Sequence, residues 1–521
     1  MQPFYFAIGL FGVKKISTSR KFAQNAIFNI AGFLVTFPIL ILLTPYMLRV
    51  LGNAQFGIWA IAGVVTSYAQ LSEMGMTTAI VKFVAEHWAK KQVNKISNIV
   101  STAFFSFAVV GGLVAAALLL ARHFIVVSIL KVPPDMRSEA IFVVSGVVII
   151  FYFNLLFSVY NSVLLGIQRM DITNSIMVVS KVLRALGMWA FLAAGFGLKG
   201  LIWNGAIFSA LTIGANIFWT KRLTGGLKIN PFWFSFSELK GILKYSANIF
   251  VAKLTGLAQD PINKIIIAAY LSLPFVAFYE VGARVTLMVR QVFQVGLSPL
   301  LPASSELDSV RNKKELEKIY FTLSHMLYLF AVPFFLLVIL LAEPLVQVWI
   351  GNGYNWAARA IQFLLIGNLF SLLVTPQYII LQGIGKPQIN TIAHAIAAVI
   401  NVVLAIVLVH YIGFLGVLIA GVISLLISSL FIDCLFRKII GIDLRAYLQE
   451  ISPVSILSCI VLSGALIYCF TFINVWSFGK LTGLAVGFSL LYLATLIFGK
   501  VTDKKDRKLL TKLFKILTFS K

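Results

Sequence analysis

Apolar runs of membrane-spanning length recur along almost the whole chain. Of its 521 residues, 60% are hydrophobic and 12% are charged, whereas a soluble globular protein carries about 25% charged residues. An apolar run of about 20 residues spans a bilayer as an α-helix. An open strand or a loop would leave its backbone polar groups unpaired in the hydrocarbon. We therefore predict an all-α polytopic membrane protein.

The apolar runs define about 14 transmembrane helices. We expect them at residues 24–48, 55–75, 97–121, 138–162, 172–195, 198–219, 246–270, 275–299, 319–342, 358–382, 388–410, 413–436, 451–473 and 478–499. The net charge of +25 could suggest a nucleic-acid partner in a soluble protein. Here most Lys and Arg residues fall in short loops on one side of the predicted bundle. That bias predicts cytoplasmic loops and two cytoplasmic termini, with no nucleic-acid partner.

The chain repeats itself at a nearly constant offset. Short segments of the first half recur in the second half in the same order: 21–25 with 244–248, 56–59 with 276–279, 166–169 with 383–386, and 197–200 with 413–416. Each repeat holds an even number of spans, so the halves share one orientation. We predict two six-helix lobes in parallel repeat plus two extra C-terminal helices, with the substrate site between the lobes.

These repeats predict the domain organisation. We expect a cytoplasmic N-terminal segment at 1–21, an N-lobe at 22–232, a C-lobe at 233–445, the last two spans at 446–500 and a basic cytoplasmic tail at 501–521. The tail has the pattern of a basic amphipathic helix at the inner membrane surface. Residues 1–12 are apolar and precede Lys14 and Lys15, which is the reverse of a signal peptide.

Residues 244–299 carry charges inside two predicted spans. These are Lys253, Asp260, Lys264, Glu280, Arg284 and Arg290. A charge at the bilayer centre costs about 3 kcal/mol, so such residues mark pathways or partners. We expect Pro261 to kink the seventh span, and the first three charges to share one stripe of that helix. Glu280 can pair with Arg284 at i,i+4, and Asp260 with Arg284 across the helix pair.

Cations outnumber acids inside the predicted spans. The candidate ligands for an anionic head group are Lys253, Lys264, Arg284, Arg290, Lys181 and Arg184. The candidate coupling or counter-ion residues are Asp260, Glu280 and Glu73. Phosphate suits this excess of positive charge because arginine binds it through two parallel hydrogen bonds. A buried ion pair that only fixes packing would account for Asp260 with Arg284, but not for the other cations.

The signatures of enzymes and metal sites are missing from the sequence. It has no Walker A loop, no G-x-S-x-G elbow, no H-E-x-x-H and no Cys/His ligand spacing. Cys434, Cys459 and Cys469 all fall in apolar spans, as small hydrophobic residues of a core do. We expect a protein that is not an enzyme and that carries no cofactor and no metal.

The number of spans, the repeat and the segments 46–52 and 56–59 together resemble a known family. They resemble the polysaccharide-repeat flippases, the Wzx-type members of the multidrug/oligosaccharidyl-lipid/polysaccharide exporter superfamily. The resemblance covers residues 19–500 and implies two lobes in a V-shaped bundle with alternating access. It also implies that an undecaprenyl-diphosphate-linked oligosaccharide crosses the bacterial inner (plasma) membrane for polysaccharide or O-antigen biosynthesis.

The same resemblance implies partners and leaves alternatives open. The partners are the lipid-linked oligosaccharide, membrane lipids, and a polysaccharide polymerase with its chain-length regulator. The first alternative is a cation-coupled small-molecule exporter of the multidrug type with the same fold. The second is a membrane glycosyltransferase or polymerase, which the short outside loops and the missing carboxylate pair disfavour. Asp260 stands equally as a Na⁺- or proton-binding residue and as a plain counter-ion.

Overall fold

The computed structural model describes residues 20–256, 260–297, 300, 304, 313–442, 453–470, 473 and 476–498. In this part of the chain every regular element is a helix, which confirms the predicted all-α polytopic fold. Ten helical stretches among the described residues are long and apolar enough to cross a membrane. The count of about 14 spans stays a prediction. Almost all of the predicted N-terminal segment and the whole C-terminal tail lie outside the described residues.

The chain divides into two compact units. Among the described residues, one lies within Ser19–Glu280 and the other begins at Val281. The lobe boundaries expected from the sequence repeat stay a prediction.

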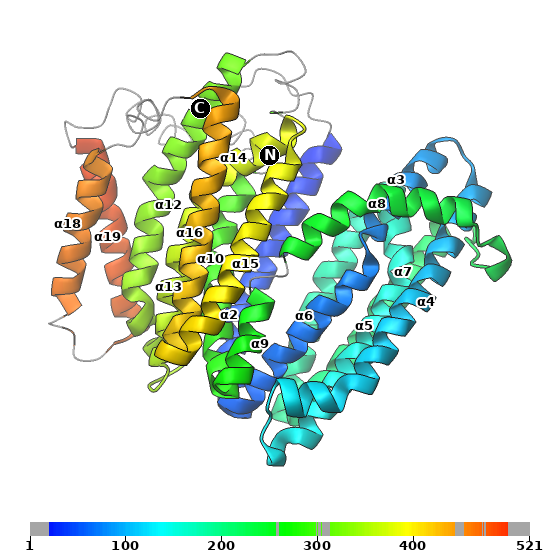
Figure 1. Cartoon of the computed structure of the whole chain (residues 1–521), viewed down its shortest axis with the longest axis horizontal. Helices are drawn as coiled ribbons and strands as arrows, with labels where there is room; N and C mark the ends of the chain where they lie inside the picture. The colour runs from blue at the N-terminus through cyan, green and yellow to red at the C-terminus, as the bar shows by residue number, and fades with distance from the viewer. Residues whose placement is uncertain are drawn as a thin grey trace. The chain divides into compact units, whose positions relative to one another are not determined.

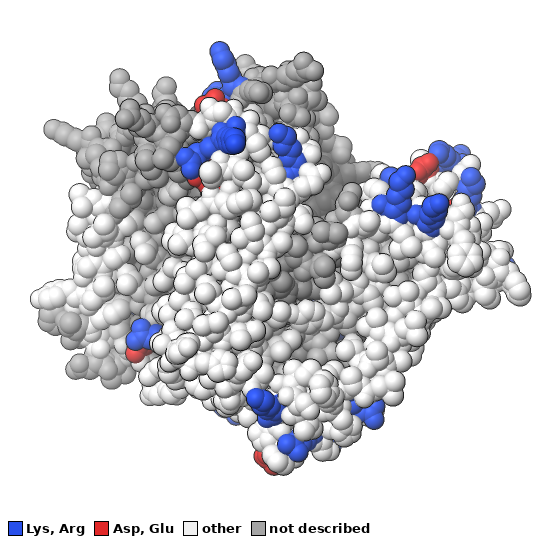
Figure 2. Space-filling model, viewed as in Figure 1, with Lys and Arg blue, Asp and Glu red and all other residues white. Residues whose placement is uncertain are grey.

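The first unit is built from α2 (Arg20–Ala69), α3 (Met76–Ala89), α4 (Val93–Phe124), α5 (Arg137–Gly166), α6 (Met170–Ala193), α7 (Gly197–Thr224), α8 (Phe236–Gly256) and α9 (Asp260–Tyr270). Within it, α5 packs against α4 and α7, while α6 packs against α7 and α2 (Figure 1). Its core buries apolar side chains from successive helices, including Ile80, Phe107 and Val159. In Figure 2 the Lys and Arg side chains visible on this unit lie at the ends of its helices, as a bilayer around their middle requires.

Glycines set two features of α2. Gly52 has a φ of 74° and a ψ of 172°, so α2 consists of two helical segments that meet there, between the predicted spans 24–48 and 55–75. A Cβ on Gly57 would lie 2.3 Å from the backbone oxygen of Leu273. Glycine at position 57 therefore allows the backbone of α2 to approach the start of α10 (Leu273–Leu297) closely.

Beyond α10, the second unit contains α12 (Lys313–Trp349), α13 (Asn355–Leu373), α14 (Thr375–Gly383), α15 (Pro387–Ile412), α16 (Phe414–Ile440), α18 (Pro453–Phe470) and α19 (Phe478–Phe498). The predicted span 358–382 forms two helices, α13 and α14. Pro376 lies in the first turn of α14, where proline is tolerated. Both α18 and α19 pack against α12. The Tyr492 hydroxyl donates to the Leu329 carbonyl at 2.8 Å.

Two glycines at matched positions of the sequence repeat have similar backbone φ angles. Gly197 begins α7 and Gly413 directly precedes α16, the matching positions of the two halves. Their φ angles are 54° and 59°, in the left-handed region that favours glycine. At both matched positions the backbone therefore adopts a φ that favours glycine.

Candidate anion and coupling site

Arg184 lies in the middle of α6, a helix long and apolar enough to span the membrane. Its side chain is exposed, and its Nη2 donates to Ser209 Oγ at 3.0 Å. Ser209 is on α7 and also accepts a bond from Asn154 Nδ2 of α5 at 3.1 Å. The Arg184 backbone carbonyl accepts from Asn204 Nδ2 at 3.2 Å. Neutral groups of two neighbouring helices thus position this guanidinium.

Lys264 has a different environment in the same unit. Its Nζ lies 2.6 Å from Glu280 Oε2, and the two side chains are 15% and 13% exposed. The pair joins α9 to the start of α10 across the turn at residues 271–272. The sequence analysis listed Lys264 as an anion ligand and predicted that Glu280 pairs with Arg284. The structure shows that a carboxylate already compensates Lys264.

A buried tyrosine holds the Asp260 carboxylate. The Tyr279 hydroxyl donates to Asp260 Oδ1 at 3.0 Å and accepts from Asn263 Nδ2 at 3.2 Å. Tyr279 is fully buried and Asn263 almost so, while Asp260 is exposed. Asp260 is the first residue of α9 and Pro261 follows it. The predicted seventh span is thus described as α8, ending at Gly256, and α9, beginning at Asp260, with residues 257–259 outside the described part.

Arg290 provides a half-buried cation in the second unit. Its Nη1 donates to Asn368 Oδ1 at 3.0 Å, and its Nη2 to Ser371 Oγ at 3.5 Å, both on α13. Nearby, the rings of Tyr378 and His394 stack at 5.1 Å. The sequence analysis selected Arg290 but gave no reason to select its partners, because single polar residues in apolar spans are common.

The remaining predicted residues are placed as follows. Lys181 is exposed one turn before Arg184 on α6, so the two cations share one side of that helix. Glu73 ends a short 3₁₀ turn and accepts a hydrogen bond from Thr77 Oγ1. Arg284 is half-buried on α10, and its predicted pairing with Asp260 stays a prediction. Lys253 belongs to α8, but its side chain lies outside the described residues.

A second ion pair was missed by the sequence analysis. In the second unit Arg437 Nη2 lies 2.8 Å from Asp433 Oδ2, one turn apart on α16. The fully buried Gln377 of α14 donates to Asp433 Oδ1 at 3.4 Å and to the Tyr320 hydroxyl at 3.2 Å. The i,i+4 spacing of Asp433 and Arg437 was the available signal.

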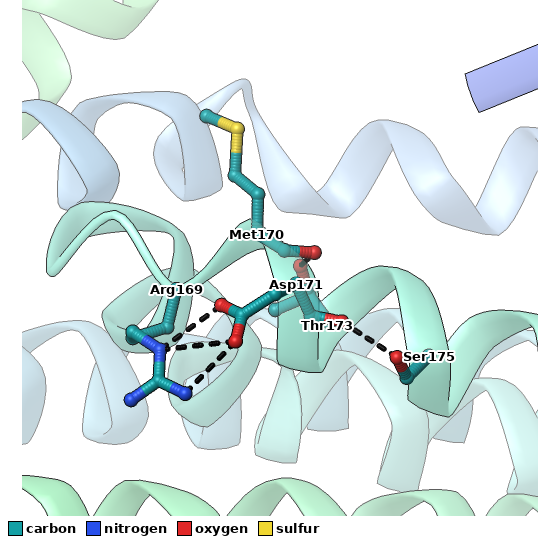
Figure 3. Close-up of polar contacts among 5 residues, drawn as sticks. All are labelled: Arg169, Met170, Asp171, Thr173 and Ser175. Atoms are coloured by element: carbon teal, nitrogen blue, oxygen red, sulfur yellow. Dashed lines mark hydrogen bonds and ion pairs between the residues drawn. The ribbon is translucent and has the colours of Figure 1, made fainter. Parts of the chain in front are cut away.

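Ion pairs at the protein surface differ from these pairs in their exposure. Figure 3 shows Arg169 and Asp171 at the start of α6, where the guanidinium faces the carboxylate and the closest contact is 2.8 Å. The two side chains are 41% and 51% exposed, and Ser175 Oγ donates to the Asp171 carbonyl. Exposed pairs of this kind contribute about 0–1 kcal/mol to stability.

Comparison with known proteins assigns the chain to a family. The profile of the family described as "Polysaccharide biosynthesis protein" matches residues 46–359. The chain belongs to this family. It is also 21% identical to the "Putative O-antigen transporter" of Shigella flexneri over 80% of this chain and 98% of that protein. The "Uncharacterized membrane protein EpsK" of Bacillus subtilis is 24% identical over 95% of this chain and 98% of that protein.

Solved structures support the fold of this polysaccharide biosynthesis family member. "Lipid II flippase MurJ, inward closed conformation" aligns with a TM-score of 0.68 and 14% identity, covering 90% of this chain and 97% of that one. An inward-facing multidrug resistance MATE family transporter of the MOP superfamily aligns with a TM-score of 0.62 and 18% identity, covering 84% and 98%. At such identities the likeness establishes the fold, which is the one that the sequence resemblance implied.

Proposed function

We propose that this protein is a flippase that moves a lipid-linked oligosaccharide repeat unit, with an undecaprenyl-diphosphate head group, between membrane leaflets for polysaccharide or O-antigen biosynthesis. The observation that carries the proposal is Arg184, an exposed cation in the middle of a membrane-spanning helix. A guanidinium that faced lipid tails at this depth would be costly. The Arg184 side of α6 therefore faces a polar space, and Lys181 adds positive charge to it.

The chemistry of Arg184 suits a diphosphate. Among the described residues its side chain makes a hydrogen bond to the Ser209 hydroxyl and no ion pair. A guanidinium presents its N–H donors as a planar fork that matches two phosphate oxygens. With Ser209 fixing one edge, the rest of the fork can bind the head group while the sugar occupies the polar space.

The other predicted residues divide between two roles in this proposal. Arg290, Arg284, Lys181 and Lys253 remain proposed as further head-group ligands. Asp260 and Glu280, with Glu73, balance charge or bind a coupling cation. We group Lys264 with the residues that balance charge, because Glu280 Oε2 lies 2.6 Å from its ammonium group.

The proposal places the protein in a bacterial inner membrane with both termini in the cytoplasm. It makes the protein a transporter rather than an enzyme. The relatives support this: the Shigella protein carries the name O-antigen transporter, and a Haloferax volcanii protein named "Probable low-salt glycan biosynthesis flippase Agl15" is 21% identical over 51% of this chain. A polysaccharide polymerase and its chain-length regulator would then act on the product in the outer leaflet.

The direct test is transport by the purified chain in proteoliposomes. A fluorescent undecaprenyl-diphosphate-linked oligosaccharide, accessible to an impermeant quencher only in the outer leaflet, reports movement between leaflets. We expect wild-type protein to move it, and Arg169→Gln, which removes only a surface ion pair, to match the wild type. If the lipid does not move while a cationic dye is exported under a Na⁺ or proton gradient, the flippase proposal is wrong and the exporter of the same fold is favoured.

A further inference from the structure

The connection between α7 and α8 carries an exposed run of aromatic residues. We call residues 231–236, with the sequence Pro-Phe-Trp-Phe-Ser-Phe, the aromatic loop. Phe232 is 91% exposed and Phe236 is 79% exposed. The rings of Phe234 and Phe236 meet edge to face at 5.0 Å. Phenylalanine rings this exposed would be unfavourable in water and favourable at a bilayer interface.

The aromatic loop is firmly held on the first unit. Asn230 accepts a hydrogen bond from the backbone of Phe232 at 3.0 Å, which fixes the start of the loop. The backbone N–H groups of Asn230 and Ser235 donate to Ser101 Oγ and Thr102 Oγ1 of α4, each at 3.1 Å. Both acceptor residues on α4 are fully buried. The fold therefore fixes the backbone that presents the rings outward.

Positive charge surrounds the aromatic loop. The exposed cations from the end of α7 through the first part of α8 are Lys221, Arg222, Lys228, Lys240 and Lys244. Glu238 is the one acid in residues 221–244 of the sequence. On the neighbouring α3, Lys82 Nζ lies 4.2 Å from the ring centre of Tyr245 and adds to this basic surface. Figure 2 shows Lys and Arg side chains gathered over the end of the unit where α3 lies.

Aromatic rings flanked by lysines suit the surface of a bilayer that contains anionic lipids. The rings enter the interfacial layer of a bilayer, and the lysines meet the negative phosphates of anionic lipids. We propose that the aromatic loop and its flanking cations form a docking surface for anionic phospholipid head groups. Charge complementarity selects anionic lipids, such as phosphatidylglycerol, over zwitterionic ones. This inference is independent of the proposed flippase function.

The docking surface lies at the start of α8, and α8 leads along the chain to α9 with Asp260 and Lys264. The proposed docking surface is therefore continuous along the chain with the segment that carries the charged residues of the candidate site.

A probe attached at the tip of the loop can test the proposal. In a background with Cys434, Cys459 and Cys469 replaced by serine, Phe232→Cys is labelled with an environment-sensitive fluorophore, and the full chain is reconstituted in liposomes. We expect a blue-shifted emission that spin-labelled phosphatidylglycerol quenches more than spin-labelled phosphatidylcholine does. Each interfacial lysine should change the preference by about fivefold. The combined variant Lys228→Gln, Lys240→Gln and Lys244→Gln should therefore lose most of the preference for phosphatidylglycerol.

The matched control is Phe196→Cys, at the turn between α6 and α7. Phe196 is 57% exposed and has one nearby cation in the sequence, Lys199, so its label should be quenched equally by both lipids. Equal quenching at position 232 would overturn the head-group selectivity. A label at 232 that stays in water in every liposome would overturn the proposal and favour an acidic protein partner instead.

Discussion

Two cations of the first unit, Arg184 on α6 and Lys264 on α9, look alike in the sequence and differ in the structure. Lys264 lies 2.6 Å from a carboxylate oxygen in a largely buried ion pair. The described side-chain bond of Arg184 goes to a serine hydroxyl, and its side chain is exposed. A compensated cation serves packing or coupling, whereas an exposed cation held by neutral groups keeps its charge available for an anion. The excess of positive charge that the sequence displays is therefore not one uniform site.

The largest expected effect is on stability, at Lys264. Lys264→Gln removes the cation that lies 2.6 Å from Glu280 Oε2 in a largely buried ion pair, and breaking a buried pair by removing one partner costs about 3–5 kcal/mol. We expect a much lower denaturation temperature and poor recovery of monodisperse protein in detergent. Because the loss arises from removing one partner of this pair, the double variant Lys264→Gln and Glu280→Gln should regain most of the stability. If the single variant is as stable as wild type, the pair does not provide the compensation that the comparison assigns to it.

The next effect is on transport, at Arg184. Arg184→Gln should lower the rate of lipid movement at least tenfold, the equivalent of about 1.4 kcal/mol of lost head-group interaction, because a neutral amide cannot replace the charged fork. Its denaturation temperature should stay near the wild-type value. Arg184→Lys keeps the charge but not the planar fork of donors, so its transport rate should lie between those of the wild type and Arg184→Gln. Transport and stability falling together would instead give Arg184 the structural role assigned to Lys264.

A smaller effect is expected from the group that positions Arg184. Ser209→Ala removes the hydroxyl that accepts from Arg184 and from Asn154, and a lost hydrogen bond costs about 1 kcal/mol. We expect a transport rate lowered roughly fivefold, with the discrimination between anionic and neutral lipids kept, because the charge remains. Ser175→Ala is the matched control, since its hydroxyl bonds only the local Asp171 carbonyl. A loss of discrimination in Ser209→Ala would show that the hydroxyl itself binds the head group.

How far the sequence could predict these residues depends on whether the relevant contacts are local. The apolar runs placed α4 and α5 within a few residues of their predicted spans, because length and composition decide that a helix spans. The ion pair between Lys264 and Glu280 was not predicted. The i,i+4 spacing favours a pair of Glu280 with Arg284, which stays a prediction, and it gives no signal for Lys264. Lys264 meets Glu280 because the hairpin sets how α9 and α10 face one another. The bond from Arg184 to Ser209 likewise depends on the packing of α6 against α7.

The smallest effect is expected at an exposed pair. Lys90 Nζ lies 2.7 Å from Glu86 Oε1 on the surface of α3, and its hydrogen bond and charge lower the pKa of Glu86. A lowered pKa in the folded state gives stability that is present above the unfolded value of about 4.3 and is lost as the pH falls through the folded value. This contribution is present at pH 7, but both side chains are exposed and such pairs contribute little, so Lys90→Ala should leave the denaturation temperature nearly unchanged. A drop approaching that of Lys264→Gln would remove the distinction between compensated cations in the membrane and on the surface.

The most direct measurement of the central claim compares one lipid-linked oligosaccharide in two forms, with a diphosphate linker and with a neutral linker of the same length. Rates of movement are measured in proteoliposomes for wild type, Arg184→Gln and the control Arg169→Gln, and the ratio of anionic to neutral rate is formed for each. The account predicts a ratio well above one for wild type and Arg169→Gln, and a ratio lower by about tenfold or more for Arg184→Gln. An unchanged ratio in Arg184→Gln would contradict the claim that this intramembrane arginine recognises an anionic head group.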